Sequence, residues 1–234
     1  MLAGLFLAAG LVVSSMLATA AWLRVRNTQF ISVKGSARTN VTADLAVWKG
    51  SFSARAATLL EAKRELQTNL VKVEAFLRQE GATNFSLLPI VIEEQKGRLD
   101  TNSLVQDLIV GYRLAQPVRV ESQDIDQISR LDRDSSELVE SGVEFTSEPL
   151  SFIYTKSAGA KIEMLAEAAR DARARAEQIA GQGGRVIAAM HSAEMGVFQI
   201  TPRYESQTSG EGMNDTTSAD KTITSVVTAT FSLK

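Results

Sequence analysis

Hydrophobic and polar residues alternate with a period of two along several stretches after residue 29, which is the pattern of strands with one buried face. In the second stretch Ala46, Trp48 and Phe52 fall on one side, so that side is expected to be buried. A turn is predicted at 35–40, between the first two strands, because it contains Gly35 and Asn40. The predicted strands are 30–37, 44–54, 85–94, 105–121, 143–154, 185–193 and 222–233.

Three stretches instead repeat apolar residues every three or four positions, which predicts helices. The first is expected to begin after Thr58, with Glu61 completing a capping box, and to end at Gly81. The second runs from Asp124 to Gly142, and the third spans about 158–180 before a glycine-rich stop.

This order of elements predicts an α+β fold, with an antiparallel or mixed sheet and helices packed on one face. The strands 85–94 and 105–121 are joined by the polar residues 96–103 and are expected to form a long hairpin. Pro89 restricts its strand to a sheet edge or a bulge, and Pro149 interrupts the strand 143–154. Residues 30–234 are interpreted as one domain, in which the polar segment 203–221 forms a flexible loop.

The N-terminal residues 2–23 carry no charge and would rise about 33 Å as a helix, close to the apolar thickness of a bilayer. One interpretation is a transmembrane anchor, residues 1–23, with Trp22 at the interface and 24–29 as a tether. The other is a signal peptide cleaved near Ala20, because Ala18-Thr19-Ala20 fits the small-x-small pattern of a cleavage site. Arg24 and Arg26, read by the positive-inside rule, would keep the domain in the cytoplasm, so charge leaves the orientation open.

Two surfaces are candidates for contacts between subunits or with a partner. Small residues recur four apart in the N-terminal run, a spacing that lets helices pack closely. The third helix has a thin stripe of mostly alanine, formed by Ile162, Leu165, Ala169, Ala172, Ala176 and Ile179. Its other face carries charges placed to pair with one another, so a solvated face is the alternative interpretation. The candidate residues are Gly10, Ser14, Ala18, Arg170, Arg173 and Glu177.

Composition narrows the chemistry further. The 25 Lys+Arg and 27 Asp+Glu give a net charge of −2, without the basic excess typical of nucleic-acid binding. The absence of Cys excludes disulfides and thiolate sites, and His191, the only histidine, has no acidic residue placed to orient it. Glu93 and Glu94 are adjacent in a strand and point to opposite faces, so they cannot act as a pair. Residues 181–184 follow a helix instead of opening one, which favours a helix stop over a phosphate loop. No catalytic residue, metal site or cofactor is expected.

Three stretches of sequence together resemble the SIMPL-domain family. They are Ile31-Ser32-Val33-Lys34-Gly35-Ser36-Ala37 with 41–46, Gly111-Tyr112-Arg113-Leu114-Ala115 with 118–120, and the Ala/Arg helix 168–180 with 184–186. Ala43 stands where this family usually has proline. The resemblance covers about 30–234 and carries no established catalytic residues.

The resemblance implies an α+β fold in bacterial proteins that are exported or anchored facing the periplasm. It also implies homo-oligomers, including large rings, and a link to oxidative-stress defence. We therefore expect a non-enzymatic, single-pass protein of the inner membrane that assembles with itself, with the domain in the periplasm. The alternative is a periplasmic binding module for a small molecule or envelope component, whose ligand the sequence does not identify.

Overall fold

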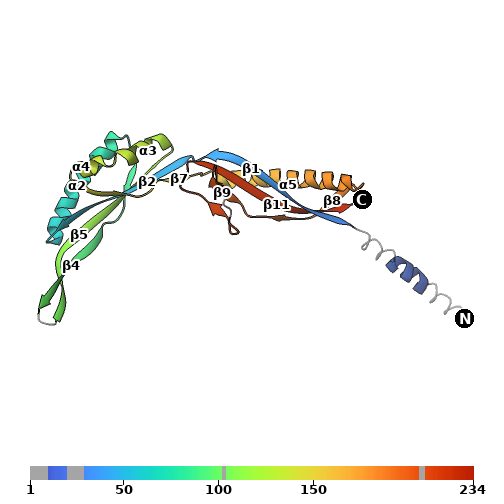
Figure 1. Cartoon of the computed structure of the whole chain (residues 1–234), viewed down its shortest axis with the longest axis horizontal. Coiled ribbons are helices and arrows are strands. Elements are labelled where there is room, and N and C mark those ends of the chain that lie inside the picture. The colour runs from blue at the N-terminus through green and yellow to red at the C-terminus, as the bar shows by residue number, and fades with distance from the viewer. Residues whose placement is uncertain (1–9, 20–28, 102–103, 206–208) are drawn as a thin grey trace.

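The computed structural model describes residues 10–19, 29–101, 104–205 and 209–234. These residues form an elongated molecule built on two sheets, with the helices of each sheet on one of its faces (Figure 1). The α+β prediction is therefore confirmed, but the strands form two sheets where one was expected.

The first sheet pairs two long antiparallel strands, β1 (Phe30–Thr42) and β11 (Asp220–Leu233). On its other side β11 pairs with β8 (Ile187–Met195) and β9 (Gln199–Pro202), and β9 pairs in parallel with the short β10 (Met213–Asn214). The single helix α5 (Ser157–Gln182) runs along β1 and β11 and covers one face of this sheet.

The second sheet has β2 (Leu45–Ala56) and β5 (Leu104–Ser122) at its centre. β3 (Phe85–Leu87) and β4 (Val91–Thr101) pair with β5, while β6 (Glu144–Ser147) and β7 (Ser151–Ile153) pair with β2. Pro89 separates β3 from β4 and Pro149 separates β6 from β7, so both edges of this sheet are interrupted at a proline, as predicted.

Helices α2 (Leu59–Gln79), α3 (Ile125–Asp134) and α4 (Glu137–Glu140) cover the second sheet. Trp48 and Phe52 of β2 are fully buried beneath them, which confirms the predicted inner face. The Trp48 indole N–H also donates to Asp132 of α3 at 3.0 Å. The N-cap at Thr58 is confirmed, since the Thr58 hydroxyl accepts from the Glu61 N–H. The second bond of the predicted capping box differs, because the Glu61 carboxylate accepts from the Thr58 hydroxyl instead of the Thr58 backbone N–H.

The turn predicted at 35–40 is wrong, because β1 continues without interruption to Thr42. Gly35 serves a different purpose. A Cβ atom built there would lie 2.2 Å from the backbone oxygen of Ala168 and 2.2 Å from the backbone nitrogen of Ala172 in α5. The glycine therefore permits close contact between strand and helix, and the chain passes straight from β1 into β2 through Ala43 and Asp44 (Figure 1).

Helix α5 buries a stripe of mostly alanine, as predicted, but the buried residues differ in part from those expected. Ile162 and Ile179, expected to be buried, are 74% and 57% exposed. The buried residues recur every fourth position from Met164 and are Met164, Ala168, Ala172, Ala176 and Ala180. The close approach at Gly35 selects this alanine row, since the larger isoleucine side chains would not fit there.

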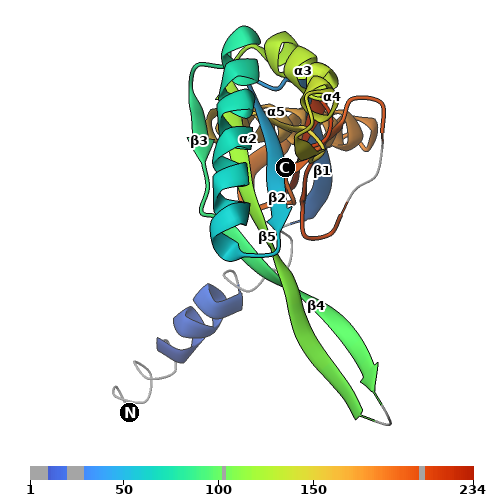
Figure 2. The same cartoon turned by 90° about the vertical axis from the view of Figure 1, so that its left-hand side faces the viewer.

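The predicted hairpin exists but is longer than expected. Residues 96–103 were interpreted as a polar connection, whereas β4 extends to Thr101 and pairs with β5 to the end. Cross-strand pairing outweighs the polar composition of this stretch. The distal part of the hairpin, residues 95–101 and 104–111, extends beyond the last pair of β2 with β5, projects from the body of the molecule and is called the arm below (Figure 2).

The segment 203–221 was expected to be a flexible loop, but it includes β10 and the start of β11. Asp215 and Lys221 are buried, and their side chains form an ion pair of 3.0 Å. A buried charge is stable when it is paired, so the polar composition of this segment does not prevent it from joining the fold.

In the part of the chain that the structure describes, no helix has the length and apolarity to cross a bilayer. Most of the predicted anchor, 1–23, and all but one residue of the predicted tether, 24–29, lie outside the described residues. Residues 10–19 are helical and exposed.

Candidate functional site

β1 is a 13-residue edge strand that contains no proline. One side pairs with β11 along the whole strand, and no described strand pairs with the other. The Ser36 N–H points to this outer side, where it donates to the Asp171 carboxylate at 2.7 Å. Alternate residues of an antiparallel strand turn their backbone groups the same way, so those of Lys34 and Arg38 also face outward.

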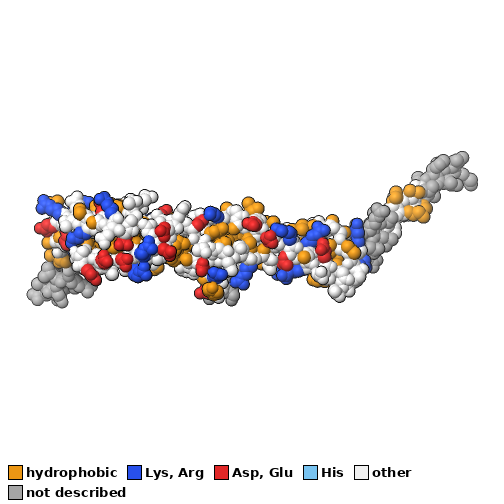
Figure 3. Space-filling view, turned by 90° about the horizontal axis from the view of Figure 1, so that it is seen from above, with side chains coloured by type: hydrophobic (Ala, Val, Ile, Leu, Met, Phe, Trp, Pro, Cys, Tyr) orange, Lys and Arg blue, Asp and Glu red, His pale blue; other side chains and the backbone are white. Residues whose placement is uncertain are grey.

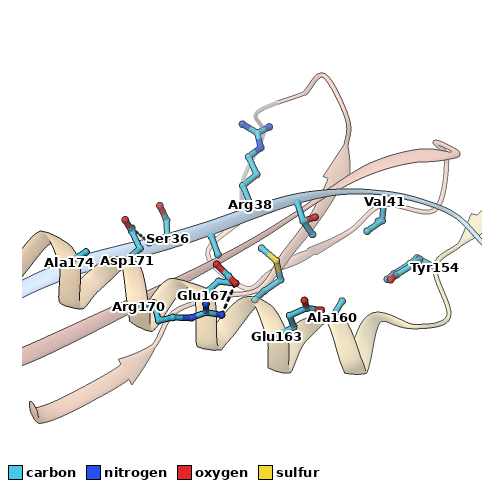
Figure 4. A pocket seen from close by; sticks show the side chains of 13 residues that line it. Ser36, Arg38, Val41, Tyr154, Ala160, Glu163, Glu167, Arg170, Asp171 and Ala174 are labelled. Carbon is cyan, nitrogen blue, oxygen red and sulfur yellow. Dashed lines mark hydrogen bonds and ion pairs between the residues drawn. The ribbon is translucent and has the colours of Figure 1, made fainter.

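A groove of about 640 Å³ lies between this edge of β1 and helix α5 (Figure 4). We call it the edge groove. Val41, Tyr154, Ala160 and Met164 contribute apolar surface to it. Its remaining lining residues are Ser36, Ala37, Arg38, Thr39, Glu163, Glu167, Arg170, Asp171 and Ala174.

Three carboxylates of α5 follow the edge groove at intervals of four residues: Glu163, Glu167 and Asp171. Residues spaced in this way lie on one side of a helix. Glu167 forms an ion pair with Arg170 at 2.6 Å, and Asp171 forms one with Arg175 at 2.9 Å. Within the described part of the chain, Glu163 has no ion-pair partner.

The neighbours of Asp171 stabilise its ionised carboxylate. The hydrogen bond from the Ser36 N–H, followed by the one from Arg175, holds the pKa of the Asp171 carboxyl below its usual value. This carboxylate therefore covers one of the backbone donors on the free edge of β1, as charged side chains often do at exposed sheet edges.

One end of the edge groove, at Val41, lies near Ala43 and Asp44. These two residues form the corner where β1 of the first sheet passes into β2 of the second. The Asp44 carboxylate accepts hydrogen bonds from the Thr155 N–H at 2.7 Å and from the Thr155 hydroxyl at 2.9 Å. Burial raises the pKa of Asp44, but these hydrogen bonds outweigh burial and leave the pKa lowered. Because Tyr154 precedes Thr155, the same contacts hold this aromatic side chain at the groove (Figure 4).

The arm forms a second distinctive surface. Leu108, Ile109 and Val110 of β5 are 47%, 47% and 58% exposed, and Val91 and Ile92 at the base of the arm, where β4 pairs with Ala115 and Leu114, are 50% and 55% exposed. Leu108 and Ile109 are neighbours in β5, so the arm presents apolar side chains on both faces. The pairing register shifts between Gln95 and Lys96, a bulge of the kind that increases the local twist.

Charges elsewhere on the surface are mixed. On the face seen in Figure 3, basic and acidic side chains are interspersed along the length of the molecule. His191 lies exposed on β8 and packs against Phe30, with 4.7 Å between ring centroids. Glu93 pairs with Arg113 at 3.1 Å. The described residues contain no group of three His, Cys, Asp or Glu that could hold a metal ion.

The residues proposed from sequence lie in different places. Arg170 lines the edge groove, whereas Arg173 and Glu177 pair with each other at 3.0 Å and are not among its lining residues. Gly10, Ser14 and Ala18 lie on the exposed helical segment 10–19. Sequence reasoning missed Ser36 and Glu163. The four-residue spacing of the acidic residues was a visible signal, but nothing in the sequence indicated that a strand edge lies beside them.

Comparison with known proteins places this fold in a family. No curated protein matches the chain. Among solved structures, a de novo designed protein, Foldit4, is similar at 14% identity with a TM-score of 0.23, over 46% of this chain and 96% of the designed one. The family described as "SIMPL: Protein of unknown function (DUF541)" matches residues 31–231, which include every strand from the second residue of β1 almost to the end of β11. The chain belongs to the SIMPL family.

Proposed function

We propose that this protein is a non-enzymatic subunit of a homo-oligomeric assembly in the bacterial envelope. Residues 1–23 anchor it in the inner membrane, and the domain faces the periplasm, where it takes part in defence against oxidative stress. The uncharged run at 2–23 and the resemblance to exported SIMPL proteins support this placement. Cleavage near Ala20 would instead release the same domain into the periplasm.

The arm is the observation that carries the proposal of assembly. Isolated two-stranded hairpins are marginally stable in water, and the arm exposes large apolar side chains on both faces. Contiguous exposed apolar surface is typical of sites where proteins associate. A second copy of the chain that packs against the arm would bury this surface and support the hairpin.

Sedimentation velocity of the full-length protein in detergent tests this proposal. We expect a species larger than a monomer, and replacing Leu108 and Ile109 together by Ser should convert it to monomer. Val71→Ser is the matched control, because Val71 is 69% exposed on α2 and lies outside the arm. A stable monomer for the unmodified chain would contradict the proposal, as would an assembly that persists in the arm variant.

A second candidate function is a binding module, and the edge groove is the observation that favours it. Its volume of about 640 Å³ lies in the range of ligand sites, and its lining combines apolar surface with a few polar groups. A fusion of alkaline phosphatase after Lys234 tests the location that both functions share. Phosphatase activity is expected, whereas an inactive fusion would place the domain in the cytoplasm.

A further inference from the structure

The outer edge of β1 differs from both edges of the second sheet, which are interrupted at Pro89 and Pro149. The backbone groups of Lys34, Ser36 and Arg38 face outward along a strand without a break. Unpaired strand edges of this kind bind extended polypeptides, whose own backbone completes the ladder. The described residues place only the Asp171 side chain on this row of donors.

The edge groove has the dimensions of a short extended segment. Its β1 side spans Ser36 to Val41, about 16 Å at the rise of a strand. Its α5 side spans Glu163 to Ala174, also about 16 Å at the rise of a helix. About five residues of extended chain would therefore fit between the two elements.

The spacing of the α5 carboxylates along the helix axis matches the spacing of side chains on one face of an extended segment. Glu163, Glu167 and Asp171 are about 6 Å apart along the helix axis. Side chains on the same face of a strand recur about every 6.6 Å. A strand with a basic residue at every second position would thus place one cation near each carboxylate in turn.

The other face of the incoming strand would lie beside basic residues of β1, so basic side chains are disfavoured there. Arg38 points away from α5 (Figure 4), and Lys34 shares its side of β1. A neighbouring strand that carried basic residues on this face would place like charges side by side, which is destabilising. The site therefore favours basic residues that alternate with neutral or acidic ones.

We propose that the edge groove binds an extended polypeptide with basic residues at alternate positions, which adds to β1 as a further strand. A carbonyl of the incoming strand replaces the Asp171 carboxylate on the Ser36 N–H, and Asp171 then pairs with a basic side chain of the ligand. This inference gives the second candidate function a ligand class and rests on that function. It does not depend on assembly through the arm.

Fluorescence anisotropy with a labelled peptide, Thr-Arg-Thr-Arg-Thr-Arg-Thr, tests the proposal on the full-length protein in detergent. A peptide of the same composition with its three arginines adjacent should bind several-fold more weakly. N-methylation of alternate backbone nitrogens keeps the charge but removes ladder donors, and we expect it to weaken binding about ten-fold or more. Equal binding of the methylated peptide would overturn strand addition.

Two variants of α5 locate the binding site. Glu167 and Glu177 are both partly exposed and both pair with an arginine, but only Glu167 lines the edge groove. We expect Glu167→Gln to weaken peptide binding about two- to five-fold and Glu177→Gln to leave it unchanged. Equal effects of the two variants would overturn the assignment of the site.

The outcomes also separate this inference from the two proposed functions, of which it rests only on the second. If an acidic peptide, Thr-Glu-Thr-Glu-Thr-Glu-Thr, binds the edge groove as well as the basic one, the groove is a binding site but the basic ligand class is wrong. If none of the peptides binds, the inference fails. The sedimentation of the same samples reports on assembly independently.

Discussion

Lys221 is a fully buried lysine at the start of β11, and its charge is compensated by one residue. Its Nζ donates to the Asp215 backbone oxygen at 2.7 Å and to the Asp215 carboxylate at 3.0 Å. Removing one partner of a buried ion pair leaves the other charge without compensation. This pair therefore ties the 215–221 segment to the first sheet.

We expect Lys221→Met to lower the free energy of unfolding by about 3–5 kcal/mol, because it leaves the Asp215 charge buried without its partner. Urea unfolding measures the change. Lys49→Met is the control, since Lys49 is 45% exposed and lies 3.9 Å from Glu148, and its effect should stay within about 1 kcal/mol. Similar losses in the two variants would contradict the role assigned to burial.

The same pair predicts a pH dependence of stability. Burial raises the pKa of Asp215, but hydrogen bonds from Thr217 and Lys221 outweigh burial and lower the pKa to about 2. A carboxyl with a lowered pKa in the folded state stabilises the protein above its unfolded pKa of 3.8, and this contribution disappears as the pH falls toward 2.

The expected loss from this one carboxyl is about 2 kcal/mol between pH 5 and pH 2. Urea unfolding at several pH values measures the slope, which Asp215→Asn should reduce in this interval. An unchanged slope in that variant would show that Asp215 does not titrate as stated.

At the scale of elements, the period-two and helical patterns predicted most strands and helices, together with the cap at Thr58. The predictions are wrong where the role of a residue depends on a contact with residues that are distant in sequence. Gly35 was predicted to be a turn residue because the residues that it contacts, Ala168 and Ala172, are more than 130 positions away in sequence. The α5 stripe was displaced for the same reason, since the strand it packs on decides which alanines are buried.

Gly35→Ala tests this packing. The added Cβ would overlap backbone atoms of α5, which cannot rotate away as a side chain can, so we expect a loss of about 2 kcal/mol or more in the free energy of unfolding. Gly159→Ala, within α5, is the control. No heavy atom lies within 4 Å of a Cβ there, and alanine is the better helix former, so this variant should be neutral or stabilising. If Gly35→Ala is equally neutral, strand and helix do not pack this closely.

At the scale of the molecule, the edge groove could not be predicted because residues distant in sequence form it. Ser36 and Asp171 are 135 positions apart, and only the fold brings the β1 edge beside the carboxylates of α5. The sequence did predict the charged face of that helix, and it identified Ala43 and Asp44 as part of the stretch that resembles the SIMPL family. It did not reveal that these two residues are the corner where β1 of the first sheet continues into β2 of the second.

The corner predicts how the two sheets are held together. Asp44 lies in the connection between β1 and β2, and its carboxylate binds Thr155, which lies between β7 of the second sheet and α5 of the first. This carboxylate therefore joins the two connections between the sheets. Asp44→Ala should cost about 1–3 kcal/mol, the usual worth of hydrogen bonds to a charged group.

Because the two sheets have separate buried cores, the loss of the Asp44 contacts should also loosen their coupling. With Trp22 replaced by Phe in every variant, Trp48 is the remaining tryptophan, and its fluorescence during urea unfolding reports on the second sheet, while circular dichroism reports on the whole chain. The two transitions should coincide in the chain without a further change and separate in Asp44→Ala. Asp126→Ala, an exposed acidic residue in the first turn of α3, is the control and should keep them coincident. Coincident transitions in Asp44→Ala would mean that contacts other than this carboxylate join the two sheets.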